Sequence, residues 1–380
     1  MSNPTVSFVV PCYKLGHLLH ECIHSILLQT YTDLELLVMD DCSPDNTPEV
    51  AMSFRDARVK HIRNEQNLGH LRNYNKGIEM SRGKYVWLIS ADDRLRRPYV
   101  LHRYVLVMSK YPAVGYVFCP GIGLENGAET TLINCGYYGP RDRIFTGRQF
   151  IAASLRNGYG LLSPSVMVRK DCYEKISDFP LDMPHQGDWY LWFRWALEYH
   201  VAYVCEPMVN YRSHDLNMMK DLQRRVPETV FSDEVTVLWR TRQHCKQKGL
   251  RALANKCEDA LTETYARAAA AAIYSDIGLH RQMSVAQCDE ALRAGASSIS
   301  EHKRLRGKFF AYMANKNWRH GDFGRARRSY AIALRNHWGM PKVWLKLLIL
   351  IAGLGRTGLF FRSFISLLNN SRPSPYEQQI

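Results

Sequence analysis

Apolar and polar positions follow two different patterns along this chain, and the change comes near residue 219. Before it, short apolar runs that are typical of buried strands alternate with segments whose apolar residues recur at helical spacing. The expected strands are 6–11, 34–40, 57–63, 85–90, 114–118 and 201–207, and the expected helices are 17–29, 71–81, 99–111 and 188–199. This order predicts an α/β fold built from βαβ units around a mainly parallel sheet.

After residue 219 the strand signals stop, and Ala-, Arg- and Leu-rich helical segments continue to the end of the chain. The stretches 275–295 and 318–338 resemble each other and the tetratricopeptide pattern, which predicts an all-α domain of helical hairpins. We therefore expect two domains, 1–220 and 221–380. Within the first, residues 119–187 are rich in Gly, Pro and Tyr and are expected to form loops over a cleft.

The charge of the chain is divided in the same way as its pattern. Residues 1–220 hold 24 Lys+Arg and 23 Asp+Glu, while residues 221–380 hold 26 and 13, so nearly all of the formal net charge of +14 lies in the second part. A basic helical surface without a recognised nucleic-acid module favours an anionic membrane surface or a protein partner over nucleic acid.

Three features bear on where the protein works. The ten cysteines are at least ten positions apart, which indicates a reducing compartment rather than a disulfide framework or a zinc site. The first residues do not resemble a secretion signal. In 343–361 the apolar run between Lys346 and Arg356 has nine residues, too few to cross a membrane. The segment is either a buried helix pair or a helix lying in a membrane interface. We therefore expect a cytoplasmic protein. If the helix lies in an interface, the protein is peripheral to the inner face of a membrane.

Polar residues follow the expected strands at the edge of the sheet where open α/β folds bind ligands. Asp41 follows the strand 34–40, and the adjacent acids Asp92 and Asp93 follow the strand 85–90. Adjacent carboxylates repel each other unless a cation or a ligand pair compensates them. The alternative is a helix-capping role at the start of 99–111.

Five segments in this order resemble the motifs of one family: VSFVVPCYK, LELLVMDDCSPDNT, NEQNLGHLRNYNKGIE, YVWLISADDRL, and HQGDWYLWFRWA with YRSHDLNMM. Over residues 5–219 the chain resembles a family 2 glycosyltransferase, an inverting enzyme of the GT-A type that uses a nucleotide-sugar donor. The resemblance implies a GT-A Rossmann-like sheet. It also implies a donor, most simply a UDP-linked sugar, and an acceptor hydroxyl on a glycan, a lipid-linked intermediate or another surface-polymer precursor.

The resemblance assigns a divalent metal, Mn²⁺ or Mg²⁺, to the acidic pair. Asp93 would coordinate the metal, and Asp92 would contact the ribose or the metal. His214 would close over the diphosphate or complete the metal site. Such ions prefer oxygen ligands and are typically held by one or two carboxylates together with substrate phosphates.

By the same resemblance, four residues would contact the nucleotide. Asp41 would accept a hydrogen bond from uracil or another pyrimidine, Pro11 and Tyr13 would flank the base, and Arg72 would contact the base or the diphosphate. Each of them has a structural alternative, as a turn residue, a packing residue or a surface arginine.

Asp188 occupies the position of the catalytic base, at the start of the helix 188–199. Its carboxylate would remove the proton from the acceptor hydroxyl, and the helix dipole should keep the pKa of this group low. Trp189 would stack on the acceptor sugar. Gly187 stands where many relatives carry Glu, so a second acid is missing there, and the segment 119–163, which should govern acceptor choice, matches no motif.

Two other readings of the sequence remain. A nucleotidyltransferase shares the α/β layout and the metal but usually carries a glycine-rich phosphate loop, which VVPCYKLGHLL lacks. A nucleotide-binding scaffold could act through the helical second domain, which would also be the natural place for homo-oligomer contacts.

Overall fold

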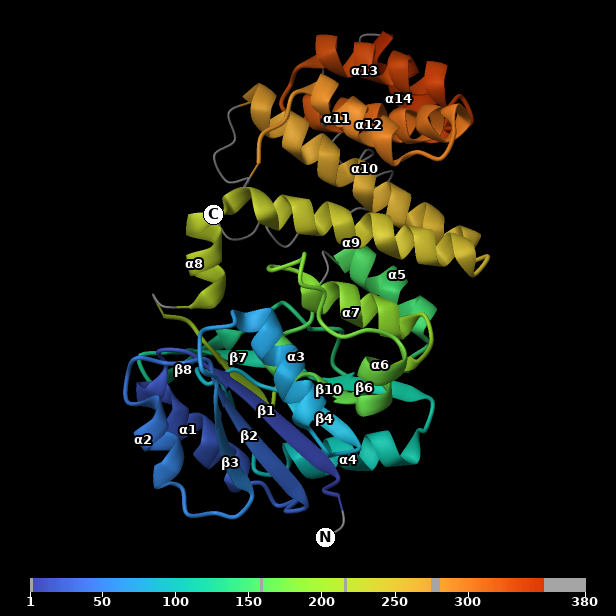
Figure 1. Cartoon of the computed structure of the whole chain (residues 1–380). Helices are drawn as coiled ribbons and strands as arrows, with labels where there is room; N and C mark the ends of the chain where they lie inside the picture. Colours follow the sequence, from blue (N-terminus) through green and yellow to red (C-terminus); the bar gives the residue numbers. More distant parts are fainter. Residues whose placement is uncertain (1–2, 158–159, 215–216, 275–280, 352–380) are drawn as a thin grey trace. The chain divides into compact units, whose positions relative to one another are not determined.

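The computed structural model describes residues 3–157, 160–214, 217–274 and 281–351. The chain divides into two compact units, Met1–Leu222 and Gln223–Ile380 (Figure 1). Each unit has its own arrangement of elements, and each is described by itself below.

The first unit is built on a mixed, mainly parallel sheet. Among the described residues it contains eight strands in the spatial order β3 (Val59–Arg63), β2 (Leu34–Asp40), β1 (Val6–Cys12), β4 (Tyr85–Leu88), β10 (Met167–Arg169), β6 (Val114–Phe118), β11 (His200–Tyr203) and β9 (Arg143–Phe145). Pairing is parallel except at β10 and β9, which run antiparallel to their neighbours. The six predicted strands are all present, with bounds that differ by up to four residues, and the predicted α/β class is confirmed.

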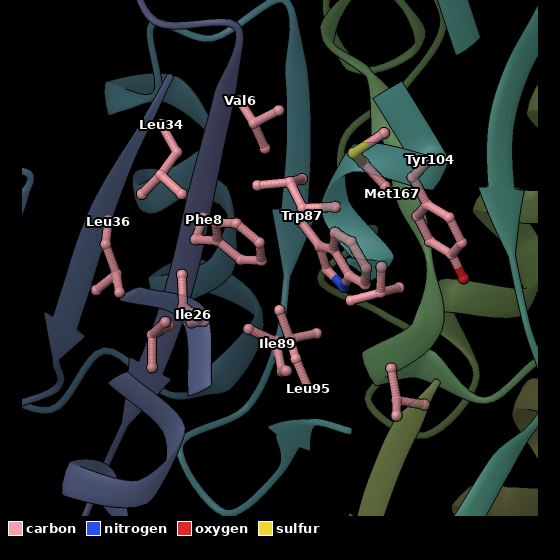
Figure 2. Packing of buried hydrophobic residues seen from close by; sticks show 14 of the residues in the cluster. Val6, Phe8, Ile26, Leu34, Leu36, Trp87, Ile89, Leu95, Tyr104 and Met167 are labelled. Atoms are coloured by element: carbon pink, nitrogen blue, oxygen red, sulfur yellow. The ribbon is translucent and has the colours of Figure 1, made fainter. Parts of the chain in front are cut away.

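Seven α-helices of the first unit connect these strands. They are α1 (Gly16–Leu27), α2 (Thr47–Ser53), α3 (His70–Met80), α4 (Val100–Lys110), α5 (Gly147–Asn157), α6 (Lys170–Lys175) and α7 (Gly187–Ala196). Aromatic rings from β1, β4 and α4 stack in the core between sheet and helix (Figure 2). Phe8 lies 5.3 Å from Trp87, and Trp87 lies 4.8 Å from Tyr104, centroid to centroid. These buried rings hold β1 and β4 firmly, and both strands lead to the candidate site.

The expectation of irregular loops over residues 119–187 is wrong. This segment contains β9, β10, α5 and α6, and also two strands of a second, four-stranded sheet, in the order β5 (Arg94–Leu95), β12 (Val209–Arg212), β7 (Gly121–Glu125) and β8 (Ala128–Leu132). Strand β8 is exposed at all its positions, so it carries no apolar alternation. Its partner β7 also pairs with β12, almost ninety residues further along the chain. Such distant pairing leaves no local sequence signal.

The second unit is helical throughout its described part. After α8 (Met218–Arg225), which crosses the boundary between the units, come α9 (Pro227–Gln247), α10 (Arg251–Tyr274), α11 (Val285–Gly295), α12 (Ile299–Arg319), α13 (Phe323–Asn336) and α14 (Pro341–Ile351). Gly249 and Gly321 end α9 and α12 with positive φ angles of 68° and 74°, as glycine does at helix C-termini. The stretch 318–338 forms the end of α12 and all of α13. Residues 275–280 of the other stretch lie outside the described residues, so its tetratricopeptide likeness stays a prediction.

A buried network of ion pairs connects α9, α10 and α12. Arg242 is 2% exposed and pairs with both Glu258 and Glu301. The guanidinium of Arg304 also donates a hydrogen bond to Glu258, at 2.7 Å. Burial raises the pKa of Glu258, but Arg304, Lys308 and Arg242 outweigh it and lower this pKa to about 2. Because charges are buried only when they are paired, this network fixes the packing of the three helices.

The helices of the described residues include none that is both long enough and apolar enough to cross a membrane. The segment 343–361 begins in α14, and its residues 352–361 lie outside the described part of the chain.

We expect Glu258→Gln to lower the free energy of unfolding of the second unit by about 3 kcal/mol at neutral pH, because it leaves the buried Arg242 without full compensation. The folded pKa of Glu258 is depressed, so its contribution is present above the unfolded pKa near 4.5 and is lost as the pH falls toward 2. Calorimetry from neutral to acid pH checks this. The difference between wild type and variant should shrink on acidification, whereas the exposed Glu290→Gln should match wild type at every pH.

Candidate active site

The acidic pair lies in the turn between β4 and β5. Asp92 and Asp93 are 7% and 3% exposed. Arg212, the last residue of β12, holds the turn in place: its backbone N–H donates to Asp93 Oδ1 at 2.9 Å, and its Nε donates to the Asp92 carbonyl at 2.8 Å. Arg212 of the second sheet therefore fixes the Asp93 carboxylate and the backbone of Asp92.

The arginines that follow the pair in sequence do not neutralise it. They form ion pairs with other acids: Arg94 with Glu21, Arg96 with Glu129, and Arg97 with Glu206. Burial, followed by the neighbouring Asp92 carboxylate, raises the pKa of Asp93 well above its usual range. Asp92 Oδ1 is buried and has no hydrogen-bond partner among the described residues. Both observations indicate a place where a cation would be stabilised.

The donor set at this place fits a divalent ion only in part. His214 Nε2 lies 2.9 Å from Asp92 Oδ2, so the imidazole faces the acidic pair. Within the described ranges, no group of three or more His, Cys, Asp or Glu side chains is spaced to hold a metal ion. Two carboxylates would therefore bind Mg²⁺ or Mn²⁺ together with oxygen atoms of a ligand, which is the usual arrangement for ions that carry substrate phosphates. Direct coordination by His214 stays a prediction.

Asp41 follows β2 and holds the loop that leads into α3. Its Oδ1 accepts hydrogen bonds from Asn64 Nδ2 and from the Leu68 N–H, both at 2.8 Å, and its Oδ2 accepts from the Gly69 N–H at 3.0 Å. A carboxylate offers about four acceptor positions, so one remains for a ligand such as a base N–H. Recognition of a base by Asp41 stays a prediction.

The end of β1 lies between Asp41 and the acidic pair. Pro11 is buried, and its carbonyl accepts a hydrogen bond from the Ala91 N–H at 3.2 Å, while the Asp41 N–H donates to the Cys12 carbonyl at 2.9 Å. Tyr13 is 41% exposed, so its ring is accessible. Arg72 is exposed on α3. The nucleotide-binding roles of Pro11, Tyr13 and Arg72 stay predictions.

Helix α3 contributes residues that the sequence interpretation missed. His70 Nε2 lies 2.9 Å from the Pro184 carbonyl. Asn75 exchanges two hydrogen bonds of 2.9 Å with the backbone of Phe179. These contacts fix the segment 179–184, which leads into α7. The spacing of His70 and Asn75 within NLGHLRNYNKG gives no separate signal, because their partners Pro184 and Phe179 lie more than a hundred positions away.

Tyr74 follows His70 by one turn of α3, and its ring packs against His70 and Phe179. Burial raises the pKa of Tyr74, and the negative charges of Asp92, Asp188 and Asp93 raise it further. The carboxylates of the β4–β5 turn and of α7 therefore act electrostatically on the same tyrosine.

Asp188 lies in the first turn of α7 with both carboxylate oxygens occupied. Oδ1 accepts from the Trp189 N–H at 2.7 Å, and Oδ2 accepts from the Ser163 hydroxyl. Trp189 is half-buried beside it, while Trp192 and Trp195 are buried in the core as the helical pattern indicates. Ser163 was not predicted, because it comes from the three-residue helix Ser163–Ser165, twenty-five positions away.

The segment expected to govern acceptor choice does approach this carboxylate. Burial, followed by the charge of Asp188, raises the pKa of Cys135 to about 12. The connection between β8 and β9 therefore passes close to Asp188, although the roles of Asp188 as base and of Trp189 as an acceptor contact stay predictions.

Part of the chain is similar in sequence to a known protein family. Residues 7–160 match the family model for glycosyl transferase family 2. The first unit belongs to this family. This agrees with the resemblance inferred from its motifs, and the match includes Asp41, Asp92 and Asp93 but ends before Asp188 and His214.

Curated relatives of the family 2 domain are glycosyltransferases of bacteria. An uncharacterised glycosyltransferase of Rickettsia typhi is 26% identical over 219 residues, which is 56% of this chain and 65% of the relative. The Escherichia coli UDP-Glc:α-D-GlcNAc-diphosphoundecaprenol β-1,3-glucosyltransferase WfgD is 36% identical over 93 residues, 24% of this chain and 37% of the relative. The chain thus spans less than two thirds of the length of these relatives.

A solved structure extends the likeness of the fold. Residues 1–349 of Staphylococcus aureus TarS, in complex with UDP-GlcNAc, superimpose with a TM-score of 0.57 and 14% identity, covering 88% of this chain and 92% of that one. The likeness covers more of the chain than the family 2 domain alone. At this identity it shows a shared fold and nothing about ligands.

We expect Asp93→Asn to raise the free energy of unfolding of the metal-free protein by about 1 kcal/mol, because it removes one of two adjacent buried charges. The unfolding temperature should rise accordingly. The same change should abolish the stabilisation that UDP with MnCl₂ gives to wild type. Thermal unfolding with EDTA and with UDP–Mn²⁺ measures both effects, and the exposed Asp178→Asn should behave as wild type. A lower unfolding temperature of Asp93→Asn in EDTA would show that the pair is already compensated.

Proposed function

We propose that the protein is an inverting glycosyltransferase that moves a sugar from a nucleotide-linked donor to an acceptor hydroxyl. The observation that supports this most directly is the buried pair Asp92 and Asp93 in a family 2 domain, with Asp92 Oδ1 lacking a partner among the described residues. Asp188 adds a carboxylate that acts electrostatically on the same tyrosine, Tyr74, as the pair does. Asp92 and Asp93 would lie on the side of the site that holds the charged diphosphate. Asp188 would lie on the other side, as the carboxylate that accepts a proton.

In the reaction, the acceptor hydroxyl would lie beside Asp188 and lose its proton to that carboxylate as the oxygen attacks the anomeric carbon. The bond from this carbon to the diphosphate oxygen breaks on the opposite face, so the configuration inverts. The nucleoside diphosphate leaves with the bonding electrons. Hydrogen bonds from Ser163 and from the Trp189 N–H would orient the base for this proton transfer.

The carboxylates of Asp92 and Asp93 would hold a divalent ion, Mn²⁺ or Mg²⁺. When bound, such an ion supplies positive charge that stabilises the departing diphosphate. The chain's own part is to fix the Asp93 carboxylate and the Asp92 backbone through Arg212, while Asp92 Oδ1 has no partner among the described residues.

A UDP-linked donor and a glycan, lipid-linked or surface-polymer acceptor are the finer part of the proposal. The name of WfgD describes the transfer of a sugar from a UDP-linked donor to a diphosphoundecaprenol-linked sugar. Asp41 retains an acceptor position that suits the N–H of uracil. The Cys135 connection near Asp188 would contact the acceptor.

We expect purified protein to release UDP from a UDP-sugar in the presence of MnCl₂, and the release to stop in EDTA and in Asp188→Asn. A panel of UDP- and GDP-sugars, assayed by nucleoside diphosphate release with and without acceptor sugars, checks this. Asp178→Asn serves as the matched control. Full activity of Asp188→Asn would contradict the role of Asp188 as the base. Thermal stabilisation by UDP–Mn²⁺ without any turnover would favour a nucleotide-binding scaffold.

Ser163→Ala should lower kcat about tenfold with little change in KM for the donor, because the base loses one hydrogen bond that orients it. The pH below which kcat falls should move upward, since a carboxylate that loses a donor is protonated more easily. Ser163→Thr keeps the hydroxyl and should restore much of the rate. A pH profile identical to wild type in Ser163→Ala would contradict this positioning role.

A further inference from the structure

The last described helix presents an apolar face to solvent. Four residues of α14 lie along one side at helical spacing, and a tryptophan precedes the helix. These five residues form the α14 outer face: Trp338, Trp344, Leu345, Leu348 and Ile351. Their exposed fractions are 79%, 45%, 40%, 58% and 61%. Trp344 Nε1 donates to the Trp338 carbonyl at 2.9 Å, which joins the two tryptophan positions.

The opposite side of α14 is already used for packing. Leu347 lies in a cluster with residues of α12 and α13, and Val343 and Leu350 pack against the same cluster. Lys346 also turns inward, where its Nζ donates to Asn315 Oδ1 at 2.9 Å. The helix is therefore apolar on both sides and buried on one. Single apolar residues are common on protein surfaces, but a continuous stripe that includes tryptophans marks a contact with a partner or a membrane.

The sequence that contains this face is strongly basic. Residues 323–376 include nine Lys and Arg and no Asp or Glu, and Asp322 before them pairs with Arg325. Among the described ones, Arg327, Arg328, Arg335 and Lys342 are exposed on α13 and at the start of α14. A partner that accepts this surface must offer negative charge and an apolar layer together.

We propose that the α14 outer face lies in the interface of an anionic lipid bilayer, with its leucine and isoleucine side chains among the acyl chains and its indoles and the surrounding cations at the headgroups. Tryptophan favours the headgroup level, and basic residues around an apolar helix face attract anionic lipids. A polyanion such as nucleic acid would not cover the apolar stripe. A second copy, joined by a two-fold contact, would bring the same cations face to face.

This inference concerns the second unit alone, so it can fail or hold independently of sugar transfer by the first unit. Its immediate consequence is a preference of the full chain for anionic over zwitterionic vesicles, with a strong dependence on salt.

The test is sedimentation of the full-length protein with vesicles of phosphatidylcholine alone and of phosphatidylcholine with phosphatidylglycerol. Wild type should sediment with the anionic vesicles at low salt, bind less as salt rises, and remain in solution with phosphatidylcholine. Leu348→Glu and Trp344→Glu should each lower binding about tenfold or more, because a charge enters the apolar face. Ile299→Glu is the matched control: Ile299 is 78% exposed on α12 of the same unit and should leave binding unchanged.

Three results would overturn the proposal. Wild type could fail to bind anionic vesicles at low salt. Leu348→Glu, shown to be folded by circular dichroism, could bind as wild type does. Size-exclusion chromatography could show a wild-type dimer that Leu348→Glu dissociates, in which case a second copy of the chain covers the α14 outer face.

Discussion

Two adjacent carboxylates buried at the end of β4 are the constraint on which the first unit depends. A fold normally avoids this arrangement, since burial and mutual repulsion both oppose ionisation of Asp93. Here Glu21 binds the guanidinium groups of Arg94 and Arg212, the two arginines best placed to neutralise the pair. Arg212 then contacts the pair mainly through its backbone N–H and its Nε. The turn is thus held in position while its charge stays largely uncompensated, which is the state a binding site for a cation requires.

Helix α3 connects the loop held by Asp41 to the segment that carries the proposed base. At its start, the loop 64–69 is bound by Asp41, and along its length His70 and Asn75 bind the segment that leads to Asp188. One helix therefore positions both segments. A change on α3 that touches neither ligand could still displace the base, because a shift of about 1 Å is enough to cost a large part of the rate.

The sequence predicted the parts of this site whose signals are local. The strands 6–11, 34–40 and 85–90 are short apolar runs, and each ends in the polar residues that the structure places at one edge of the sheet. The second sheet was missed, because β7 and β12 pair across a long separation. One local signal was available: Asn126 and Gly127 both have positive φ angles, as expected for an Asn-Gly hairpin turn between β7 and β8.

Ser163, His70 and Tyr74 could not be predicted from pattern alone. Ser163 contacts Asp188, and His70 contacts Pro184, through folding of distant segments, and neither lies in a periodic run that marks its partner. Tyr74 stands in a helical pattern where an aromatic residue is more often a packing residue. What distinguishes it is the electrostatic effect of three acids, a property of the assembled fold rather than of its neighbours in sequence.

Other buried acids of this chain are paired with cations, and the acidic pair at the end of β4 differs from them. Glu258 of the second unit is buried with Arg242 and Arg304, and Glu35 of the first unit is buried with Lys60 and Arg82. The pKa of each of these two carboxyls is lowered to about 2. In the first unit the pKa of Asp93 is raised and Asp92 Oδ1 lacks a partner among the described residues. A chain that pairs Glu35 and Glu258 in this way has the means to pair Asp92 and Asp93 as well. Leaving the acidic pair only partly compensated lowers stability, and a cation that binds there restores it.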